Sequence, residues 1–520
     1  MDTGRLALSR GAQLATIAVP AAFLALFFAF PLAAILERGL TSTGGLSLPA
    51  NTTELLWFTT WQAAASTVLT LVAGLPLAWA IGRFRFRGRS LVRALVLVPF
   101  VLPTVVVATA FLIVLPDGYE RGLWAILAAH VFFNVAVVTR IVGSAWATID
   151  PRSAEAAAVL GAGPLRRMRE VTLPQLAPAL SAASALTFLF CFTSFGVILI
   201  LGGPGRATVE TEIYNQAARM FDLQAAAALS LLQLGAVAVV LTVAGILEAR
   251  AGGNTTLADE NDVLRRPRGW ERFALVGVLG AGAVALLFPL VVLLERSWGS
   301  WDALFEATPA LLVDPWEAAV FSVIFAGVAA AIALVVGGFA AIALARRPAG
   351  VVDGFVLLPL GASAVMLGFG FLIAFDEAPV DFRSSWWLVP VAQSLIAAPF
   401  VVRIVTPALR SIDPALREVA ATLGASPLRS RREIDTPLVG RAFAVAAGFA
   451  FAIALGEFGA TVFVARAEQP TLPVAIFRFL GRPGEANQGV AAALAVVLAV
   501  IAACAALLAE RVADGRGRAL

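Results

Sequence analysis

Two segments of the chain repeat each other: residues 149–174 read IDPRSAEAAAVLGAGPLRRMREVTLP, and residues 412–437 read IDPALREVAATLGASPLRSRREIDTP. The offset is constant at 263 residues, and 15 of the 26 aligned positions are identical. A repeat of this length indicates a duplicated fold rather than a chance motif. Both copies are polar, whereas the surrounding chain is very apolar. We therefore expect the duplicated feature to be a surface that faces something outside a membrane.

The composition of the chain indicates a membrane protein. Of its 520 residues, 60% are hydrophobic and 14% are charged, and the mean hydropathy is +0.89. Because a soluble core of this size could not bury so much apolar surface, we predict an all-α polytopic membrane protein. Twelve apolar stretches, six per copy, are long enough to cross about 30 Å of hydrocarbon. They are residues 13–36, 56–81, 94–116, 122–146, 176–202, 225–247, 273–295, 317–345, 351–375, 387–409, 441–465 and 488–510.

The first apolar stretch is expected to remain in the mature protein as an anchor, because no small-residue cleavage site follows it. The repeat then divides the chain into a first six-helix unit, 1–250, and a second, 271–520. Between them, residues 251–270 are rich in Gly, Asn, Asp and Glu, which is typical of a linker. The polar repeats form the loops 149–175 and 412–438.

Arginine placement predicts the topology, because short cytoplasmic loops collect positive charge. With the N-terminus inside, the connections after the second, fourth and sixth helices are arginine-rich, and the opposite connections are acidic or mixed. Both polar loops, the linker and both termini are then cytoplasmic. Each unit crosses an even number of times, so the units form parallel repeats. The arginines are Arg83, Arg85, Arg87, Arg89, Arg93, Arg166, Arg167, Arg169, Arg265, Arg266, Arg268 and Arg272.

Several classes of function are disfavoured by residues that are scarce. All 38 basic residues are arginine, so the chain cannot carry the GxxxxGK[ST] loop with which many proteins bind ATP. The net charge of +4 does not predict a nucleic-acid partner, because the arginines lie where topology places them. Cys191 and Cys504 lie in apolar helices, where cysteine acts as a small hydrophobic residue. We therefore predict a protein that is not an enzyme and has no metal site or cofactor.

The one histidine, His130, lies one helical turn from Asn134 in the predicted fourth helix. Polar groups inside membranes commonly form hydrogen bonds between helices. We therefore favour an interhelical role for His130, with a role in handling substrate or protons as the alternative.

Each polar loop is predicted to contain two short helices. Asp150 suits the N-cap and Pro151 the first turn of a helix that ends at Gly161, where a left-handed residue is easily accommodated. A second helix begins at Pro164 and ends near Pro174, from which the next span departs. The corresponding residues of the second copy are Asp413, Pro414, Gly424, Pro427 and Pro437.

At these residues the chain resembles the permease subunits of bacterial ABC importers, whose signature is a cytoplasmic EAA loop. The second copy departs from the pattern at Val419 and Thr436, which replace Ala and Leu. The matching residues are Glu155, Ala156, Ala157, Gly161 and Pro174 in the first copy and Glu418, Ala420, Gly424 and Pro437 in the second.

The resemblance implies the type I ABC importer permease fold in a bacterial cytoplasmic membrane. In that family each EAA loop forms a coupling helix that docks in a groove of one ATPase subunit. The resemblance therefore implies two copies of a separate ATPase subunit and an extracytoplasmic substrate-binding protein as partners, and the coupling residues named above as the contact.

The chain is most similar to the fused double permeases of thiamine and ferric-iron importers. The stretches 129–134, 191–196, 201–204 and 212–214 look thiamine-like, whereas residues 457–459 follow a pattern of ferric-iron permeases. The resemblance favours thiamine, with ferric iron as the alternative. A secondary carrier or channel is a less favoured reading, because it gives no reason for matching cytoplasmic loops.

The repeat offset pairs Ser194 and Phe195 with Glu457 and Phe458, and we expect a substrate path between the two units to include these residues, with His130 as a further candidate. A carboxylate inside a span needs water, a partner or a cation. Glu457 could stabilise the thiazolium cation of thiamine, beside the two phenylalanines. Equally, it could pair with an arginine or extend to the membrane interface.

Overall fold

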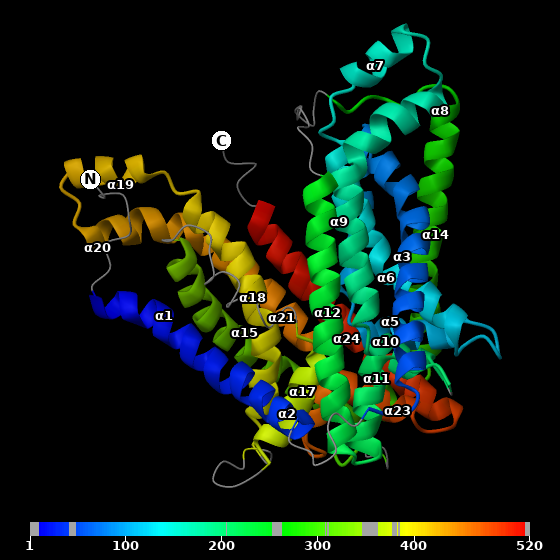
Figure 1. The fold of residues 1–520 in the computed structure, drawn as a ribbon, viewed down its shortest axis with the longest axis vertical. Helices are drawn as coiled ribbons and strands as arrows, with labels where there is room; N and C mark the ends of the chain where they lie inside the picture. Colours follow the sequence, from blue (N-terminus) through cyan, green and yellow to red (C-terminus); the bar gives the residue numbers. More distant parts are fainter. Residues whose placement is uncertain are drawn as a thin grey trace. The chain divides into compact units, whose positions relative to one another are not determined.

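The computed structural model describes residues 10–40, 48–203, 205–251, 263–306, 308, 311–345, 362–376, 382 and 385–514. The regular structure within these ranges is helical, apart from one isolated bridge between Phe84 and Arg265. The helices are α1 (Arg10–Leu24), η1 (Ala25–Ala29), α2 (Phe30–Leu40), α3 (Thr52–Arg83), α4 (Arg89–Val101), α5 (Thr104–Val114), α6 (Leu123–Trp146), α7 (Arg152–Val159), α8 (Pro164–Arg167), η2 (Met168–Thr172), α9 (Leu173–Phe192), α10 (Gly196–Leu201), α11 (Val209–Tyr214), η3 (Asn215–Arg219), α12 (Leu223–Ala251), α14 (Trp270–Ser297), η4 (Asp302–Phe305), α15 (Pro315–Ala345), α17 (Ala364–Ala374), α18 (Leu388–Arg410), α19 (Pro414–Thr422), α20 (Pro427–Ser430), η5 (Arg431–Asp435), α21 (Thr436–Gly456), α22 (Thr461–Val464), α23 (Leu472–Leu480) and α24 (Glu485–Asp514) (Figure 1).

Ten helical segments in the described ranges are long and apolar enough to cross a membrane, and a bent helix pair would make an eleventh. The prediction of an all-α polytopic membrane protein is confirmed. The predicted count of twelve spans differs from the ten that are seen, because the third and ninth predicted helices are not single long helices. The ten spans are Leu14–Leu40, Thr52–Arg83, Leu123–Trp146, Pro164–Phe192, Leu223–Leu247, Trp270–Ser297, Pro315–Ala345, Leu388–Arg410, Arg432–Gly456 and Glu485–Ala509.

The third predicted helix, 94–116, is two helices that meet at 96°. They are α4 and α5, and the break lies at Leu102 and Pro103. Leu102 has an extended backbone, with φ −67° and ψ 135°. The ring of a following proline disfavours helical conformation in the residue before it, so Pro103 accounts for the break.

The ninth predicted helix, 351–375, is represented by α17, because residues 351–361 lie outside the described ranges. The 11 residues of α17 extend roughly 16 Å, about half of the hydrocarbon thickness. Its start is set by Ser363, whose hydroxyl accepts hydrogen bonds from the backbone N–H groups of Val365 and Met366. A cap at this position separates α17 from the residues before it.

The predicted helices 176–202 and 441–465 are shifted toward the N-terminus. The observed spans are Pro164–Phe192 and Arg432–Gly456, and each is followed by a break and a short helix, α10 or α22. The predicted end of a helix near Pro174 and Pro437 was therefore wrong. The π-helical turns η2 and η5 lie directly before these prolines, and the Leu173 N–H donates to the Met168 carbonyl across five residues. Both prolines occupy the first turn of the next α-helix, where the missing N–H is tolerated.

The chain forms two compact units. Unit 1 comprises residues 1–48, 213–231 and 297–520, and unit 2 comprises 49–212 and 232–296. Each unit therefore contains the first long helix of the opposite half of the sequence, α1–α2 in unit 1 and α14 in unit 2. The division into 1–250, 251–270 and 271–520 follows the sequence repeat and stays a prediction about how the chain was duplicated.

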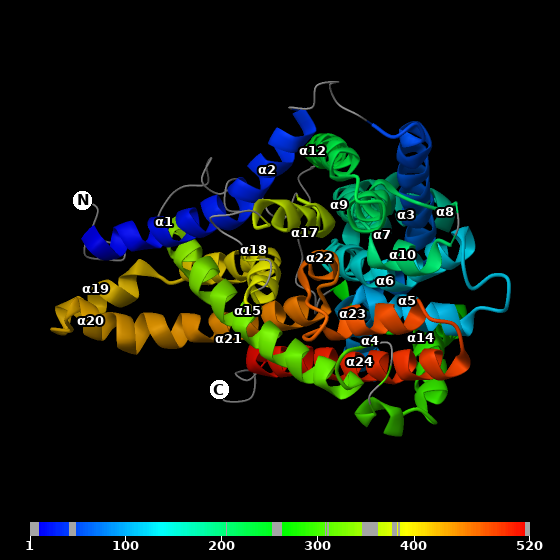
Figure 2. The same ribbon diagram turned by 90° about the horizontal axis from the view of Figure 1, so that it is seen from below.

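Equivalent helices form the core of each unit. In unit 2, α3, α6 and α9 lie side by side (Figures 1 and 2) and bury a cluster that includes Ala78, Val142 and Leu176. Gly74 of α3 lies so close to α6 that an added Cβ would be 2.8 Å from Val138. Unit 1 repeats this arrangement with α15, α18 and α21, and the same approach occurs 263 residues later, between Gly337 and Val401. The glycines allow close helix packing.

Candidate functional site

Each polar loop folds as a helical hairpin. Hairpin 1, residues 150–174, consists of α7, a turn, and α8 followed by η2, and hairpin 2, residues 413–437, consists of α19, a turn, and α20 followed by η5. In Figure 1 each hairpin lies at one end of the long helices of its own unit. The two short helices that the sequence predicts in each loop are therefore present.

The first helix of each hairpin is capped by an aspartate. The Asp150 carboxylate accepts a hydrogen bond of 2.9 Å from the Arg152 backbone N–H, and the Asp413 carboxylate accepts one of 2.9 Å from Ala415. Such bonds satisfy donors at the helix start that have no partner within the helix. The predicted role of both aspartates is confirmed.

A glycine ends this helix in both hairpins. Gly161 has a φ of +86° and Gly424 a φ of +81°, a conformation that other residues rarely adopt. In hairpin 1 the Ala162 N–H donates to the Ala157 carbonyl at 2.9 Å, and in hairpin 2 residue 425 donates to the Ala420 carbonyl at the same distance. These bonds form Schellman motifs. The glycine and the alanine carbonyl together set the direction in which the chain leaves the helix.

Apolar side chains are exposed beside these glycines. The side chain of Leu160 is 87% exposed and that of Leu423 is 82% exposed, although both loops are otherwise polar. Glu155 and Glu418, one and a half turns earlier, are exposed too. In hairpin 1 the neighbouring Val159 and Leu165 are exposed too, at 88% and 82%, so the apolar side chains there form more than a single exposed position. The sequence analysis did not single out Leu160 or Leu423, although the tripeptide Leu-Gly-Ala occurs in both copies of the repeat.

Hairpin 1 is connected to the body of unit 2. The Gln175 amide of α9 donates to the Ser153 hydroxyl of α7 at 3.1 Å. A pocket of about 90 Å³ lies beneath α7, and Glu155, Arg83 and Arg265 are among its lining residues. The hairpin therefore faces, across this pocket, the end of α3 and the chain that precedes α14.

His130 joins three elements of unit 2 through hydrogen bonds. Its Nδ1 atom is 3.0 Å from the Ser66 hydroxyl of α3, and its Nε2 atom is 2.9 Å from the Ser194 hydroxyl, directly after α9. The Asn134 amide donates to the Cys191 sulfur at 3.5 Å. The predicted interhelical bonding of His130 is confirmed, and two of the predicted path residues, His130 and Ser194, are in contact.

Glu457 lies in the break between α21 and α22 rather than inside a span. Its side chain is buried, and its carboxylate accepts backbone hydrogen bonds from Ala460 at 2.7 Å and from Thr461 at 3.0 Å. These bonds cap α22, a role that the sequence did not reveal. Phe458 is buried against Phe477, with ring centroids 5.5 Å apart. Phe195 is buried at the equivalent break of unit 2.

Comparison with known proteins decides the family. The family described as "binding-protein-dependent transport system inner membrane component" matches residues 74–252 and again 333–516, together more than half of the chain. The chain belongs to this family. It is therefore a multi-pass permease of the inner membrane, and the two matches show that the permease carries the family domain twice.

Curated relatives match the permease over nearly its whole length. It is 29% identical to the thiamine transport system permease protein ThiP of Brucella abortus (strain 2308), over 94% of this chain and 93% of the relative. It is 27% identical to the protein of the same name from Salmonella typhimurium, over 91% and 93%. It is 25% identical to the probable ABC transporter permease protein y4fN of Sinorhizobium fredii, over 94% of each chain. These matches extend across both copies of the family domain in this chain.

Proposed function

We propose that this permease forms the membrane pathway of a thiamine importer and that two copies of a separate ATPase subunit dock on its hairpins. One observation carries the docking proposal: the two hairpins have the same caps, the same glycine-closed turn and the same exposed leucine, 263 residues apart. A similar surface made twice suits two copies of one partner. The arginine-rich connections support a cytoplasmic position for both hairpins and both termini.

A continuous helical segment links each hairpin to the break between two helices, α9 and α10 in unit 2 or α21 and α22 in unit 1. In unit 2 the helical segment runs from Pro164 to Phe192, and Ser194 follows it; in unit 1 the segment runs from Arg432 to Gly456, and Glu457 follows it. Each segment extends roughly 40 Å at about 1.5 Å per residue. A displacement of the hairpin by the ATPase is therefore transmitted along a stiff rod to the break. This linkage supports the coupling role of residues 149–175 and 412–438.

The residues at the two breaks are proposed to line the substrate path. They are the predicted path residues Ser194, Phe195, Glu457 and Phe458, with His130 bonded to the first of them. A chain that leaves its helix within the membrane is tolerated where it lines a cavity or is buried in protein. Movement of the rods would then change the positions of these side chains directly.

Thiamine is the proposed substrate, delivered by an extracytoplasmic binding protein. The sequence resemblance and the names of the relatives from Brucella and Salmonella, which are thiamine transport permeases, both support it.

Uptake of radiolabelled thiamine tests the proposed function. We expect a strain that lacks its own thiamine transport, and that expresses this permease with its ATPase and binding protein, to accumulate thiamine only when the ATPase is active. Ferric iron uptake in the same strain is the matched control. Accumulation of iron but not thiamine would show that iron is the substrate. Thiamine uptake that persists without the ATPase would show that transport is not driven by ATP hydrolysis.

Substitution of Glu457 by glutamine tests its place in the path. Glutamine keeps one acceptor oxygen for the cap of α22 but removes the charge that would attract a thiazolium cation. We expect the Glu457→Gln permease to assemble normally and to transport thiamine with a several-fold higher KM. A lower melting temperature at an unchanged KM would assign Glu457 to capping alone.

A further inference from the structure

The first long helix of each half of the sequence is a second repeat. The sequence FPLAAILER at residues 30–38 corresponds to FPLVVLLER at residues 288–296, an offset of 258 residues. Helices α1–α2 and α14 are therefore two versions of one helix. One is packed in unit 1 and the other in unit 2.

In unit 1, aromatic side chains fill the space beside this helix. Phe27 packs against Phe371 of α17 and Trp387 at the start of α18, with ring centroids 6.4 and 6.2 Å apart. Phe23 and Leu24 belong to the same cluster. A cavity between Pro20 and Leu24 of this helix and α15 and α18 has a volume of only about 10 Å³, so little space is left at that contact.

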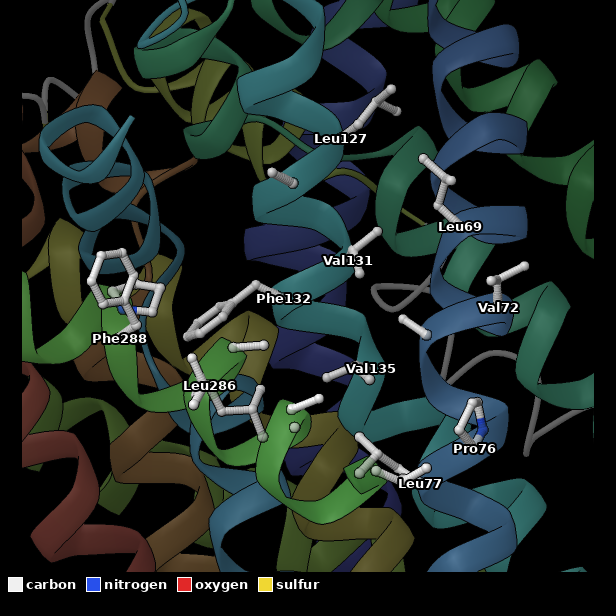
Figure 3. Close-up of a pocket in the computed structure, with 18 of the residues that line it drawn as sticks. Leu69, Val72, Pro76, Leu77, Leu127, Val131, Phe132, Val135, Leu286 and Phe288 are labelled. Atoms are coloured by element: carbon white, nitrogen blue, oxygen red, sulfur yellow. The ribbon is translucent and has the colours of Figure 1, made fainter. Parts of the chain in front are cut away.

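In unit 2, the same space is open. At the offset of 258 residues, Phe23, Leu24 and Phe27 are replaced by Ala281, Gly282 and Ala285. A groove of about 910 Å³ lies between α14 and helices α3, α5 and α6 (Figure 3). Its lining residues include these three small residues.

The groove retains the aromatic partners that unit 1 uses. Phe371 corresponds to Phe111 at an offset of 260, and Trp387 to Trp124 at 263. Both Phe111 and Trp124 line the groove. Unit 2 thus has the surface that receives a phenylalanine in unit 1 but has alanine where unit 1 has that phenylalanine.

The depth of the groove restricts what fills it. The lining parts of α3, α6 and α14 lie inside the candidate spans, for example at Val72, Val131 and Leu286, and no lining residue in the described ranges is charged. An empty apolar space of this size would forfeit the dispersion contacts of its walls. At membrane depth the available filler is hydrocarbon.

We propose that this groove holds an acyl chain of a membrane phospholipid, which takes the place of Phe23 and Phe27 and attaches α14 to unit 2. Protein contacts hold α14 at its start, where Trp270 stacks on Trp79 with centroids 6.5 Å apart and Glu271 pairs with Arg265. Gly282 adds one contact within the groove, where an added Cβ would be 2.8 Å from the Leu77 side chain. Along the groove the lipid chain supplies the missing contact. This proposal does not depend on the substrate or on ATPase docking.

Photo-crosslinking in proteoliposomes tests the lipid site. A phosphatidylglycerol with a diazirine in its acyl chain is expected to label residues 277–289 of α14 more strongly than the rest of that helix. The double substitution Ala281→Phe with Ala285→Phe restores the side chains of α1, and we expect it to abolish the excess labelling. The matched control is Val276→Phe with Val291→Phe, on exposed positions of α14 outside the groove lining.

The reverse substitution keeps the test independent of how the filled variant folds. Phe23→Ala with Phe27→Ala is expected to open the equivalent space in unit 1 and to create new labelling on α15 and α18 there. Labelling of residues 277–289 no stronger than that of the rest of α14, or unchanged by the filled groove, would overturn the proposal.

Discussion

Replacement of Leu160 and Leu423 by glutamate is expected to release the ATPase subunits from the permease while leaving its fold intact. Both side chains are more than four-fifths exposed, so the permease itself loses little packing. Burial of each leucine in a partner would contribute about 1.5 to 3 kcal/mol, and two lost contacts would weaken assembly by roughly a hundredfold or more. Co-purification of the ATPase and its affinity for the permease in nanodiscs measure the effect.

The control for this experiment is Leu160→Met with Leu423→Met, which keeps an apolar side chain of similar volume. It is expected to retain the ATPase. The melting temperature of the glutamate variant should equal that of the unsubstituted permease. Full retention of the ATPase by the glutamate variant would show that the leucines lie outside the docking surface.

Replacement of Gly161 and Gly424 by valine is expected to lower ATP-driven uptake strongly. A side chain in the left-handed region costs about 1 to 2 kcal/mol even without a clash, and more for a β-branched residue. The space around both glycines is open, since nothing lies within 4 Å of an added Cβ. The substitution therefore acts on the backbone turn. Uptake and ATPase co-purification are both expected to fall at least tenfold, because both hairpins change direction.

Gly163 provides a control within the same hairpin. Its backbone has an ordinary φ of −65°, and the space around it is also open. Gly163→Val is expected to preserve ATPase binding and uptake. Asparagine at 161 and 424 is expected to be tolerated better than valine, because asparagine enters the left-handed region more readily. Equal activity of all these variants would remove the turn from the coupling mechanism.

The hairpins could be predicted from the sequence because their structure is set locally. Asp150 and Pro151 start a helix, and Gly161 ends it, through bonds that span five residues or fewer. The second copy of the repeat has the same residues at 413, 414 and 424, so the same helix could be predicted there. Glu155 and Glu418 were also recognised from the sequence, because the family motif is contiguous. Leu160 and Leu423 required the structure, since exposure depends on what the rest of the chain leaves uncovered.

The membrane helices were predicted less completely. Hydropathy reports whether a stretch is apolar but not whether it is straight, so the break at Pro103 was read as part of one helix. The spans that end at Phe192 and Gly456 were placed too late, because π-helical turns carry the helix through Pro174 and Pro437. A proline normally marks a helix boundary. The sequence alone did not show that a π-helical turn before each of these prolines lets the helix continue.

The sequence by itself determined the class, the duplication and the two hairpins, because composition, repeats and capping act on residues that are near one another in the chain. The tertiary structure decided which helices belong to which unit, how Glu457 caps α22 and where Ala281 and Ala285 leave a groove. These features depend on side chains that meet across long sequence separations. Packing in three dimensions therefore distinguishes the two copies of a helix, whereas their shared FPL and LER residues make them look alike.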